Sequence, residues 1–238
     1  MDLKELGILS DDPSTHWYYR SKARAMLAML GRRSPNCILD VGAGSGFFSR
    51  YLLEHTDATE ALCLDTGYAK EWDEMQSGKP IRYRRTISSS PADLLLMMDV
   101  LEHVDDDHGL LSDCAGKVQR GGNVLISVPG FQWLWSEHDE FLEHRRRYSL
   151  EQLERLVERS GLKVIAGAYF FGLVLPIAVV GRFPSLLWRR AARRPRSQLV
   201  RHSQLVNEML SRVCAAEIPM MRANRIGGLT AFCLASIE

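Results

Sequence analysis

Residues 37–48, Cys-Ile-Leu-Asp-Val-Gly-Ala-Gly-Ser-Gly-Phe-Phe, constrain the fold of this chain more than any other stretch. An apolar run ends in an acid, three glycines follow at alternate positions, and an amphipathic run starts at Phe47. This pattern predicts a strand, a tight loop and a helix. Glycine accepts left-handed turns and lets a ligand approach bare backbone, and a helix N-terminus offers free N–H donors. We therefore expect a nucleotide-type binding loop, with a tight turn that binds nothing as the alternative.

Two positions near this loop bear on the identity of its ligand. The dinucleotide fingerprint G-x-G-x-x-G, started at Gly42, requires a glycine where Phe47 stands, which argues against a nicotinamide cofactor. Asp65 ends a second apolar run and lies 19 residues beyond Gly46, near the spacing at which a carboxylate binds the ribose hydroxyls of an adenosine ligand. The glycine loop and Asp65 would bind the same adenosine ligand, and their agreement favours a binding loop over an empty turn.

Further apolar runs alternate with helical patterns and indicate an α/β fold. Residues 93–100 form a continuous apolar run between acids, as expected for a central parallel strand that is covered on both faces. The carboxyl end of this strand, from Asp99 to Val104, should lie beside the glycine loop. We also expect strands near residues 60–65, 81–87, 123–129, 164–171 and 228–237. The predicted fold is a doubly wound, Rossmann-like sheet that is mostly parallel, with its last strand antiparallel and a helical cap insertion before that strand.

Composition limits the classes of function. A net charge of +1 gives no general attraction to nucleic acid. The five scattered cysteines offer neither a zinc knuckle nor a CxxC redox pair, and the N-terminus lacks the pattern of a signal peptide, so we expect a cytoplasmic protein with reduced thiols. Residues 172–201 combine apolar residues with arginines and contain no acid. Either a peripheral membrane contact or a helical cap with a solvated basic face fits this segment.

Residues 130–148 are rich in rings and titratable groups and follow a predicted strand, so they belong on the ligand face of the sheet. His138 and His144 are candidates for a catalytic base, with Asp139 to orient one of them, and a structural loop histidine is the alternative for each. Arg145 and Arg147 suit an anionic acceptor, with exposed surface arginines as the alternative. The remaining candidates for acceptor binding are the ring side chains of Trp133, Trp135 and Tyr148.

The ordered motifs resemble the class I S-adenosylmethionine (SAM) dependent methyltransferases, and within them the branch similar to ubiquinone and menaquinone biosynthesis enzymes. The matching stretches are residues 38–46, Asp65, residues 98–104 and residues 121–129. The resemblance implies a seven-stranded sheet with the last strand reversed, and SAM as the cofactor. The cofactor-binding residues that it implies are Asp40, Gly42, Ala43, Gly44, Gly46, Asp65, Thr66, Asp99, Val100 and His103.

We expect the chain to divide into four parts. Residues 1–36 form an N-terminal helical flap, 37–171 the SAM-binding Rossmann-like core, 172–227 a basic and apolar helical cap insertion, and 228–238 the final edge strand of the core. The aromatic run at residues 16–19 either closes over the cofactor site or packs beneath the sheet.

Two details of the site remain open at this point. Enzymes of this kind often carry an acid after the third strand for the adenine amine, but residues 86–89 contain none, which leaves the backbone or Ser88 for this contact. The similar ubiquinone O-methyltransferases use acids and a histidine in the region of Asp99, Glu102 and His103 for a divalent cation. Glu102 and His103 can equally cap the following helix or line the SAM site, and we expect no metal.

The predicted function is transfer of the sulfonium methyl group to a small-molecule or lipid-like acceptor, at oxygen. The cofactor already activates the methyl group, so the protein has to align a nucleophile with the S–CH3 bond in a dry pocket. The alternative is a SAM-binding regulatory or scaffold protein without catalysis. We expect no nucleic-acid partner, and the sequence predicts no oligomeric state.

Overall fold

The computed structural model describes residues 13–180 and 203–238, and its centre is one eight-stranded sheet with the order β3-β4-β2-β1-β5-β6-β8-β7. The five neighbouring strands from β4 to β6 are parallel, and β8 is antiparallel to both of its neighbours. The predicted fold class is therefore confirmed. The strands are β1 (Cys37–Val41), β2 (Glu60–Leu64), β3 (Trp72–Gln76), β4 (Lys79–Arg84), β5 (Leu94–Met98), β6 (Asn123–Pro129), β7 (Leu162–Phe170) and β8 (Thr230–Ile237).

Two details of the sheet differ from the prediction. β3 is an additional strand, antiparallel to β4 at the edge of the sheet. Ser77 and Gly78 between them have φ angles of 52° and 77°, as a two-residue hairpin turn requires. The prediction that the final strand lies at an edge is wrong, because β8 lies between β6 and β7. After helix α6 (Leu150–Arg159), β7 forms the edge of the sheet. The reversed strand β8 then lies between β6 and β7.

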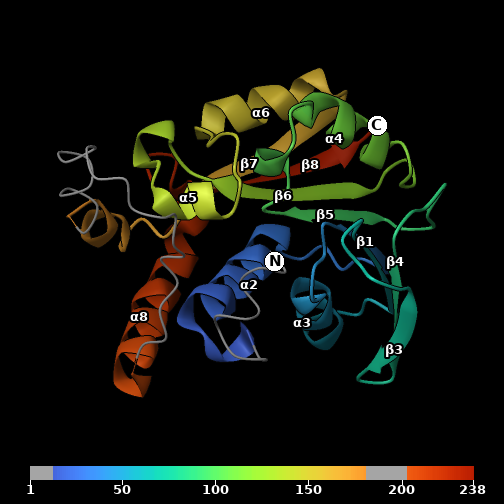
Figure 1. Cartoon of the computed structure of the whole chain (residues 1–238), viewed down its shortest axis with the longest axis horizontal. Coiled ribbons are helices and arrows are strands. Elements are labelled where there is room, and N and C mark those ends of the chain that lie inside the picture. Colours follow the sequence, from blue (N-terminus) through green and yellow to red (C-terminus); the bar gives the residue numbers. More distant parts are fainter. Residues whose placement is uncertain (1–12, 181–202) are drawn as a thin grey trace.

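Helices cover both faces of this sheet (Figure 1). α2, α3 and α8 lie on one face, and α4 and α6 lie on the other. Each face has its own cluster of buried apolar side chains. The helices are η1 (Pro13–Thr15), α2 (Trp17–Leu30), α3 (Phe47–His55), η2 (Leu101–His103), α4 (Asp107–Ala115), η3 (Gln132–Leu134), α5 (Glu137–Phe141), α6 (Leu150–Arg159), α8 (Gln204–Glu217) and η4 (Ile218–Ala223).

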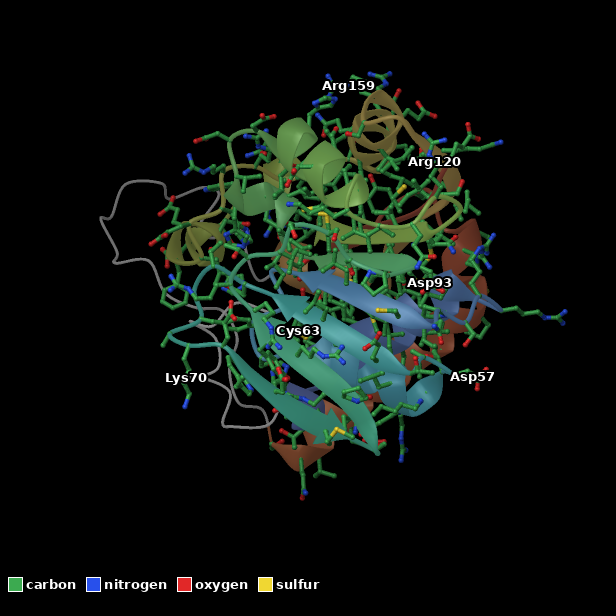
Figure 2. The ribbon with its side chains drawn as sticks, turned by 90° about the vertical axis from the view of Figure 1, so that its right-hand side faces the viewer. Asp57, Cys63, Lys70, Asp93, Arg120 and Arg159 are labelled. Atoms are coloured by element: carbon green, nitrogen blue, oxygen red, sulfur yellow. The ribbon has the colours of Figure 1, made fainter. Side chains whose placement is uncertain are left out.

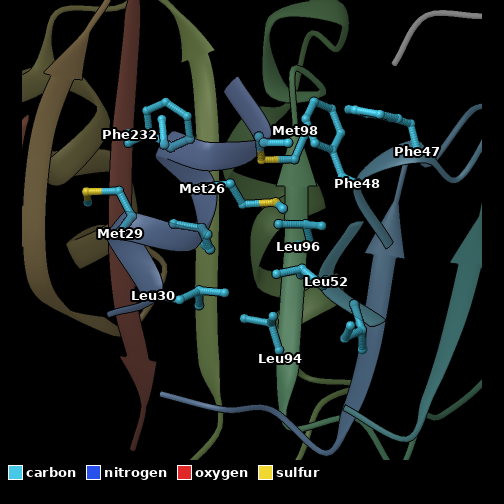
Figure 3. Packing of buried hydrophobic residues seen from close by; sticks show 14 of the residues in the cluster. Met26, Met29, Leu30, Phe47, Phe48, Leu52, Leu94, Leu96, Met98 and Phe232 are labelled. Atoms are coloured by element: carbon cyan, nitrogen blue, oxygen red, sulfur yellow. The ribbon is translucent and has the colours of Figure 1, made fainter. Parts of the chain in front are cut away.

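Helix α2 packs against the sheet as part of the core. Its apolar residues recur every three or four positions, which places them on one face of the helix. Figure 3 shows three of them, Met26, Met29 and Leu30, between side chains of α3, β5 and β8. These residues of α2 therefore pack in the core, whereas closure of the aromatic run over the cofactor site stays a prediction. Residues 1–12 of the predicted flap lie outside the described residues.

The described parts of the predicted cap insertion are residues 172–180 and 203–227, and residues 181–202 lie outside the description. Helix α8 lies beside α2, where the Asn207 side chain accepts a hydrogen bond from the backbone N–H of Trp17 (2.7 Å) and donates one to the carbonyl of Thr15 (2.7 Å). Arg20 and Glu208 form an ion pair between the same helices (2.9 Å). Within the described residues, no helix is long and apolar enough to cross a membrane.

The parallel strands all end at one edge of the sheet. Figure 2 marks the opposite edge with Asp57 and Asp93, which precede β2 and β5, whereas Lys70, which follows β2, lies on the other side of that view. The loops after β1, β2, β5 and β6 therefore share one edge, which is where the predicted site residues are expected.

Candidate functional site

The loop after β1 has the left-handed backbone that glycine permits. Gly42, Gly44 and Gly46 have φ angles of 66°, 54° and 71°. A Cβ on Gly42 would lie 2.7 Å from Cγ2 of Val100, and one on Gly46 would lie 2.6 Å from Oη of Tyr83. Neither position has room for a side chain. The contact at Gly42 also places Val100, which follows β5, directly against the loop.

Asp65 joins the end of β2 to the glycine loop. Its Oδ2 accepts a hydrogen bond from the N–H of Gly44 (3.0 Å), and its Oδ1 accepts one from the N–H of Gly67 (2.8 Å). The hydroxyl of Tyr68 donates to the carbonyl of Gly44 (2.7 Å), and Thr66 is exposed beside Asp65. The carboxylate therefore faces the loop from the position at which the sequence predicts contact with ribose hydroxyls.

Asp40 lies beneath the loop, inside the core. Its side chain is buried and accepts a hydrogen bond from Oγ of Ser49 in α3 (2.7 Å). Burial raises the pKa of this carboxyl group to about 6. Asp40 thus connects β1 to the first turn of α3 and supports the loop from below, which is an indirect contribution to cofactor binding.

Asp99, directly after β5, forms an ion pair that the sequence did not predict. Lys22 of α2 is fully buried, and its Nζ donates to Oδ2 of Asp99 and lies 5.5 Å from the centre of the Tyr18 ring. Ser127 at the end of β6 donates to Oδ1 of Asp99 (3.2 Å). Burial alone would raise the pKa of Asp99 and lower that of Lys22, but their mutual attraction reverses both shifts. Both groups are therefore charged.

The position of Lys22 in the sequence could have predicted a buried ion pair. Lys22 follows Tyr19 by three residues and precedes Met26 by four, so helical spacing places it on the apolar face. An unpaired ammonium on a buried face is costly, so a lysine at this spacing indicates a buried acidic partner. The sequence does not say which acid that partner is.

The loop after β6 folds around Asp139 in α5. This buried carboxylate accepts hydrogen bonds from the N–H (2.8 Å) and Oγ (3.0 Å) of Ser136, from Nε (2.6 Å) and Nη2 (3.0 Å) of Arg147, and pairs with Nδ1 of His144 (2.9 Å). Burial would raise its pKa, but the hydrogen bonds from His144 and Arg147 hold it well below the ordinary value. Asp139 thereby fixes the ring of His144 and leaves Nε2 for another contact.

Glu102, His103 and His144 meet at the end of β5. One polar atom from each lies within 4.8 Å of the others, and the two imidazole centres are 4.7 Å apart. Glu102 is fully buried, and neither carboxyl oxygen has a hydrogen-bond partner among the described residues. Burial and the nearby Asp99 raise the pKa of Glu102 well above its ordinary value. An oriented histidine therefore lies at the same sheet edge as the glycine loop.

Comparison with known proteins identifies this architecture. The model of a methyltransferase domain family matches residues 15–166, which is more than half of the chain. The chain belongs to this methyltransferase family. Ubiquinone biosynthesis O-methyltransferases of Nitrosomonas europaea and Coxiella burnetii are 27% and 31% identical to it over 109 and 103 residues. These matches cover 42% and 38% of this chain and 46% and 42% of those enzymes, so the chain spans less than half the length of these relatives.

Solved methyltransferase structures share the fold over most of this chain. A methyltransferase in complex with the Haloferax volcanii Trm112 activator has a TM-score of 0.58 at 16% identity, covering 98% of this chain and 92% of that one. Haemonchus contortus phosphoethanolamine N-methyltransferase 2, in complex with SAM, has a TM-score of 0.54 at 17% identity, covering 91% and 52%. The predicted family and fold are confirmed, and SAM is the methyl donor typical of the family.

Two features of the methyltransferase bear on where SAM would bind. The hydroxyl of Ser45, buried within the glycine loop, has no hydrogen-bond partner among the described residues. Ser88 borders an open hollow of about 600 Å³ after β4, with Leu62, Arg84 and neighbouring residues of the 86–89 loop. No acid lines this hollow. The contact of the adenine amine with backbone groups or with Ser88 therefore stays a prediction.

Several predicted acceptor-binding residues instead hold the 130–148 loop together. Arg147 is buried and directs all three of its side-chain nitrogens at Asp139 and the carbonyl of Gly130. Tyr148 is also buried, with its hydroxyl 2.8 Å from Asp107. Arg145 donates to the carbonyl of His103 (2.9 Å) and pairs with Asp105 (2.5 Å). These contacts give the three side chains structural roles, and their contact with an acceptor stays a prediction.

The other predicted residues of this loop lie outside the cluster at Glu102. Trp133 is exposed and lies against Phe131, with ring centres 5.6 Å apart, and Trp135 is half-buried where η3 ends. His138 is half-buried on α5 and is not part of the three-residue cluster. Of the two predicted histidines, His144 is the one that Asp139 orients.

The divalent-cation set implied by the family resemblance does not fit these residues. Asp99 is already paired with the buried ammonium of Lys22, and a cation bound to Asp99 would face that positive charge. Glu102 and His103 of the same set lie together with His144.

A separate cavity of about 780 Å³ lies between residues 146–148 and α6. Arg146, Arg155 and Arg159 are among its lining residues, and it shares none with the glycine loop or the Glu102 cluster. Arg147 and Tyr148 also line it, so it borders the loop that holds Asp139.

Proposed function

We propose that this protein transfers the methyl group of SAM to a hydroxyl group of a small-molecule or lipid-like acceptor. The observation that carries the proposal is the position of His144, which Asp139 orients beside Glu102 at the end of β5. Val100, two residues before Glu102, packs against Gly42 of the predicted SAM loop. A histidine with one fixed orientation is thus close to the site where the methyl group is expected.

The chemistry requires few protein groups. Methyl transfer from a sulfonium is an in-line displacement, so the protein mainly aligns the acceptor with the S–CH3 bond and excludes water. A hydroxyl becomes a good nucleophile when its proton is withdrawn, and this is the task that we assign to His144. Asp139 and the residues that hold it keep the imidazole in one orientation and tautomer.

The apolar character of the acceptor is inferred from the aromatic side chains near Asp99. Phe171 stacks on Tyr18 with ring centres 5.1 Å apart and meets Trp17 edge-on at 5.7 Å. The hydroxyl of Tyr18 lies 3.4 Å from Nζ of Lys22, which binds Asp99. Phe171 is fully buried, and the half-buried rings of Trp17 and Tyr18 that it supports are the ones that would meet an aromatic ring or a hydrocarbon chain.

The SAM site is tested with Gly44→Asp. The new carboxylate would lie in the loop next to Asp65, and we expect SAM to bind at least about tenfold more weakly in calorimetry or equilibrium dialysis. Gly78→Asp is the matched control, because Gly78 also has a positive φ (77°) but has open space around it in the β3–β4 turn. Equal SAM binding by both variants, with both folded, would refute the assignment of the loop.

The transfer itself is tested with methyl-labelled SAM and fractionated cell extract, asking whether label enters the lipid, small-molecule or protein fraction. We expect His144→Ala to lower the transfer rate about 100-fold or more without weakening SAM binding, and His138→Ala to stay close to wild type. Tight SAM binding with no transfer to any fraction would instead support the alternative of a SAM-binding regulatory or scaffold protein.

A further inference from the structure

We propose that Glu102, His103 and His144 form a binding site for a divalent transition metal of the Zn²⁺ type. This inference departs from the expectation of no metal, and also from the Asp99-containing set that the family resemblance implies. The role we give the metal rests on the proposed function: with Nε2 of His144 bound to the ion, the ion takes over from His144 the task of holding the acceptor oxygen and lowering the pKa of its hydroxyl. The binding site itself is independent of that function.

The distances among the three side chains suit one ion. Their ligating atoms all lie within 4.8 Å of one another. Metal bonds of about 2.1 Å at tetrahedral angles place ligand atoms about 3.4 Å apart. Small rotations of the side chains, moving each atom by about 1 Å or less, would bring the set to that geometry.

Glu102 supplies independent evidence that the site takes a ligand. Both of its carboxyl oxygens are buried without a hydrogen-bond partner among the described residues. Other buried acids differ in this respect, because Asp40 has Ser49 as a partner and Asp139 has Arg147 and Ser136. A buried polar group without a partner is costly, and a bound cation would satisfy Glu102.

His144 is arranged as a metal ligand usually is. Nδ1 of its ring pairs with Oδ1 of Asp139 at 2.9 Å, which leaves Nε2 as the ligating atom. A carboxylate behind the imidazole fixes the ring and makes it a stronger donor, as in carboxylate–histidine–zinc sites. Arg147 and Ser136 in turn hold Asp139. The loop therefore presents a preorganised donor to the end of β5.

The donor set determines the choice of metal. Asp99 is paired with Lys22 and is therefore not counted as a ligand. The site then contains two imidazoles and one carboxylate. Imidazole donors favour Zn²⁺, Co²⁺ and similar ions, whereas Mg²⁺ prefers oxygen ligands. We therefore expect selection of transition metals over Mg²⁺.

Metal binding by the full chain without SAM provides the test. Chelator-treated protein is dialysed against Zn²⁺, Co²⁺ or Mg²⁺, and bound metal is measured by mass spectrometry and by the visible spectrum of Co²⁺. We expect about one equivalent of Zn²⁺ or Co²⁺ and no retained Mg²⁺. His144→Ala and Glu102→Gln should each weaken Co²⁺ binding at least about tenfold, whereas His108→Ala, a histidine on α4 outside the cluster, should not.

Asp99→Asn separates the two possible ligand sets and should retain Co²⁺ binding. Retention of Mg²⁺ alone, absence of any bound metal, or loss of binding in Asp99→Asn but not in His144→Ala would each overturn the proposal. Circular dichroism verifies the fold of every variant, and Glu102→Gln and His144→Ala decide the outcome if Asp99→Asn does not fold. SAM is absent from these assays, so a negative result leaves the proposed methyl transfer untouched.

Discussion

Burial of Asp40 beneath the glycine loop has a measurable effect on stability. Its pKa in the folded chain is raised to about 6, above the ordinary value of 3.8, so the folded state binds the proton more tightly than the unfolded state does. The stabilising contribution of the protonated group is therefore fully present below about pH 4 and is lost as the pH rises through about 6. A shift of about two pH units corresponds to about 3 kcal/mol.

The variant Asp40→Asn tests this effect, because an asparagine oxygen can still accept the hydrogen bond from Ser49. Urea unfolding at several pH values should show that the wild-type chain loses about 3 kcal/mol relative to Asp40→Asn between pH 4 and pH 7. Parallel stability curves for the two proteins would contradict the predicted charge state of Asp40.

Single residues of the site were predictable to different degrees. The spacing of glycines and acids placed the loop, Asp65 and Val100 at one edge, because the carboxyl ends of parallel strands meet there. The sequence could not distinguish the roles of His144 and His138. It shows that both histidines follow β6 and so lie at the ligand edge of the sheet, but it does not show which way a loop side chain points. For the same reason Arg147 and Tyr148 were expected at the acceptor, although their polar groups hold the loop together.

Among the elements, helix α2 links packing to the site through Lys22. Replacing Lys22 with Met would leave the half-buried Asp99 carboxylate, whose side chain is 26% exposed, without its ammonium partner. Breaking a buried ion pair on one side costs about 3 kcal/mol or more. Because water reaches part of the Asp99 side chain, we expect Lys22→Met to lower the free energy of unfolding by less than this, about 1–3 kcal/mol. We also expect it to weaken SAM binding, because Asp99 loses the contact that positions it.

Urea unfolding and SAM titration check this prediction. The double variant Lys22→Met with Asp99→Asn should recover much of the lost stability, because no half-buried carboxylate then lacks its partner. Lys70→Met is the matched control, since Lys70 is exposed after β2. Similar stability of Lys22→Met and Lys70→Met would mean that the ion pair does not contribute as argued.

The elements that the sequence predicted best are those with continuous apolar runs. β1, β5 and β6 are buried on both faces, and their patterns have few competing interpretations. β3 has alternating polar residues at an edge, so no hydrophobic pattern marks it. The place of β8 depends on which strand fills the position beside β6, and this is a property of the whole sheet that no local pattern contains.

At the scale of the whole molecule, exposed apolar side chains are found on the cap insertion. Ile177 and Val180 are 65% and 72% exposed, and Leu205 at the start of α8 is 85% exposed. Figure 1 places residues 172–180, drawn in orange, at the same end of the molecule as α5, which belongs to the loop after β6. The sequence between the two described parts adds seven arginines and no acid. This combination suits the surface of an anionic membrane near the proposed acceptor site.

We therefore expect the full chain to co-sediment with vesicles that contain anionic phospholipid and not with neutral vesicles, and to dissociate as salt screens the attraction. The paired substitution Ile177→Glu and Val180→Glu should weaken this binding, because two charges then oppose burial of that surface in the interface. Met75→Glu is the control, since Met75 is similarly exposed (64%) but lies on β3 at the far edge of the sheet. Equal vesicle binding by both variants would exclude this surface, and a concentration-dependent dimer abolished by the paired substitution would identify a second copy of the chain as its occupant.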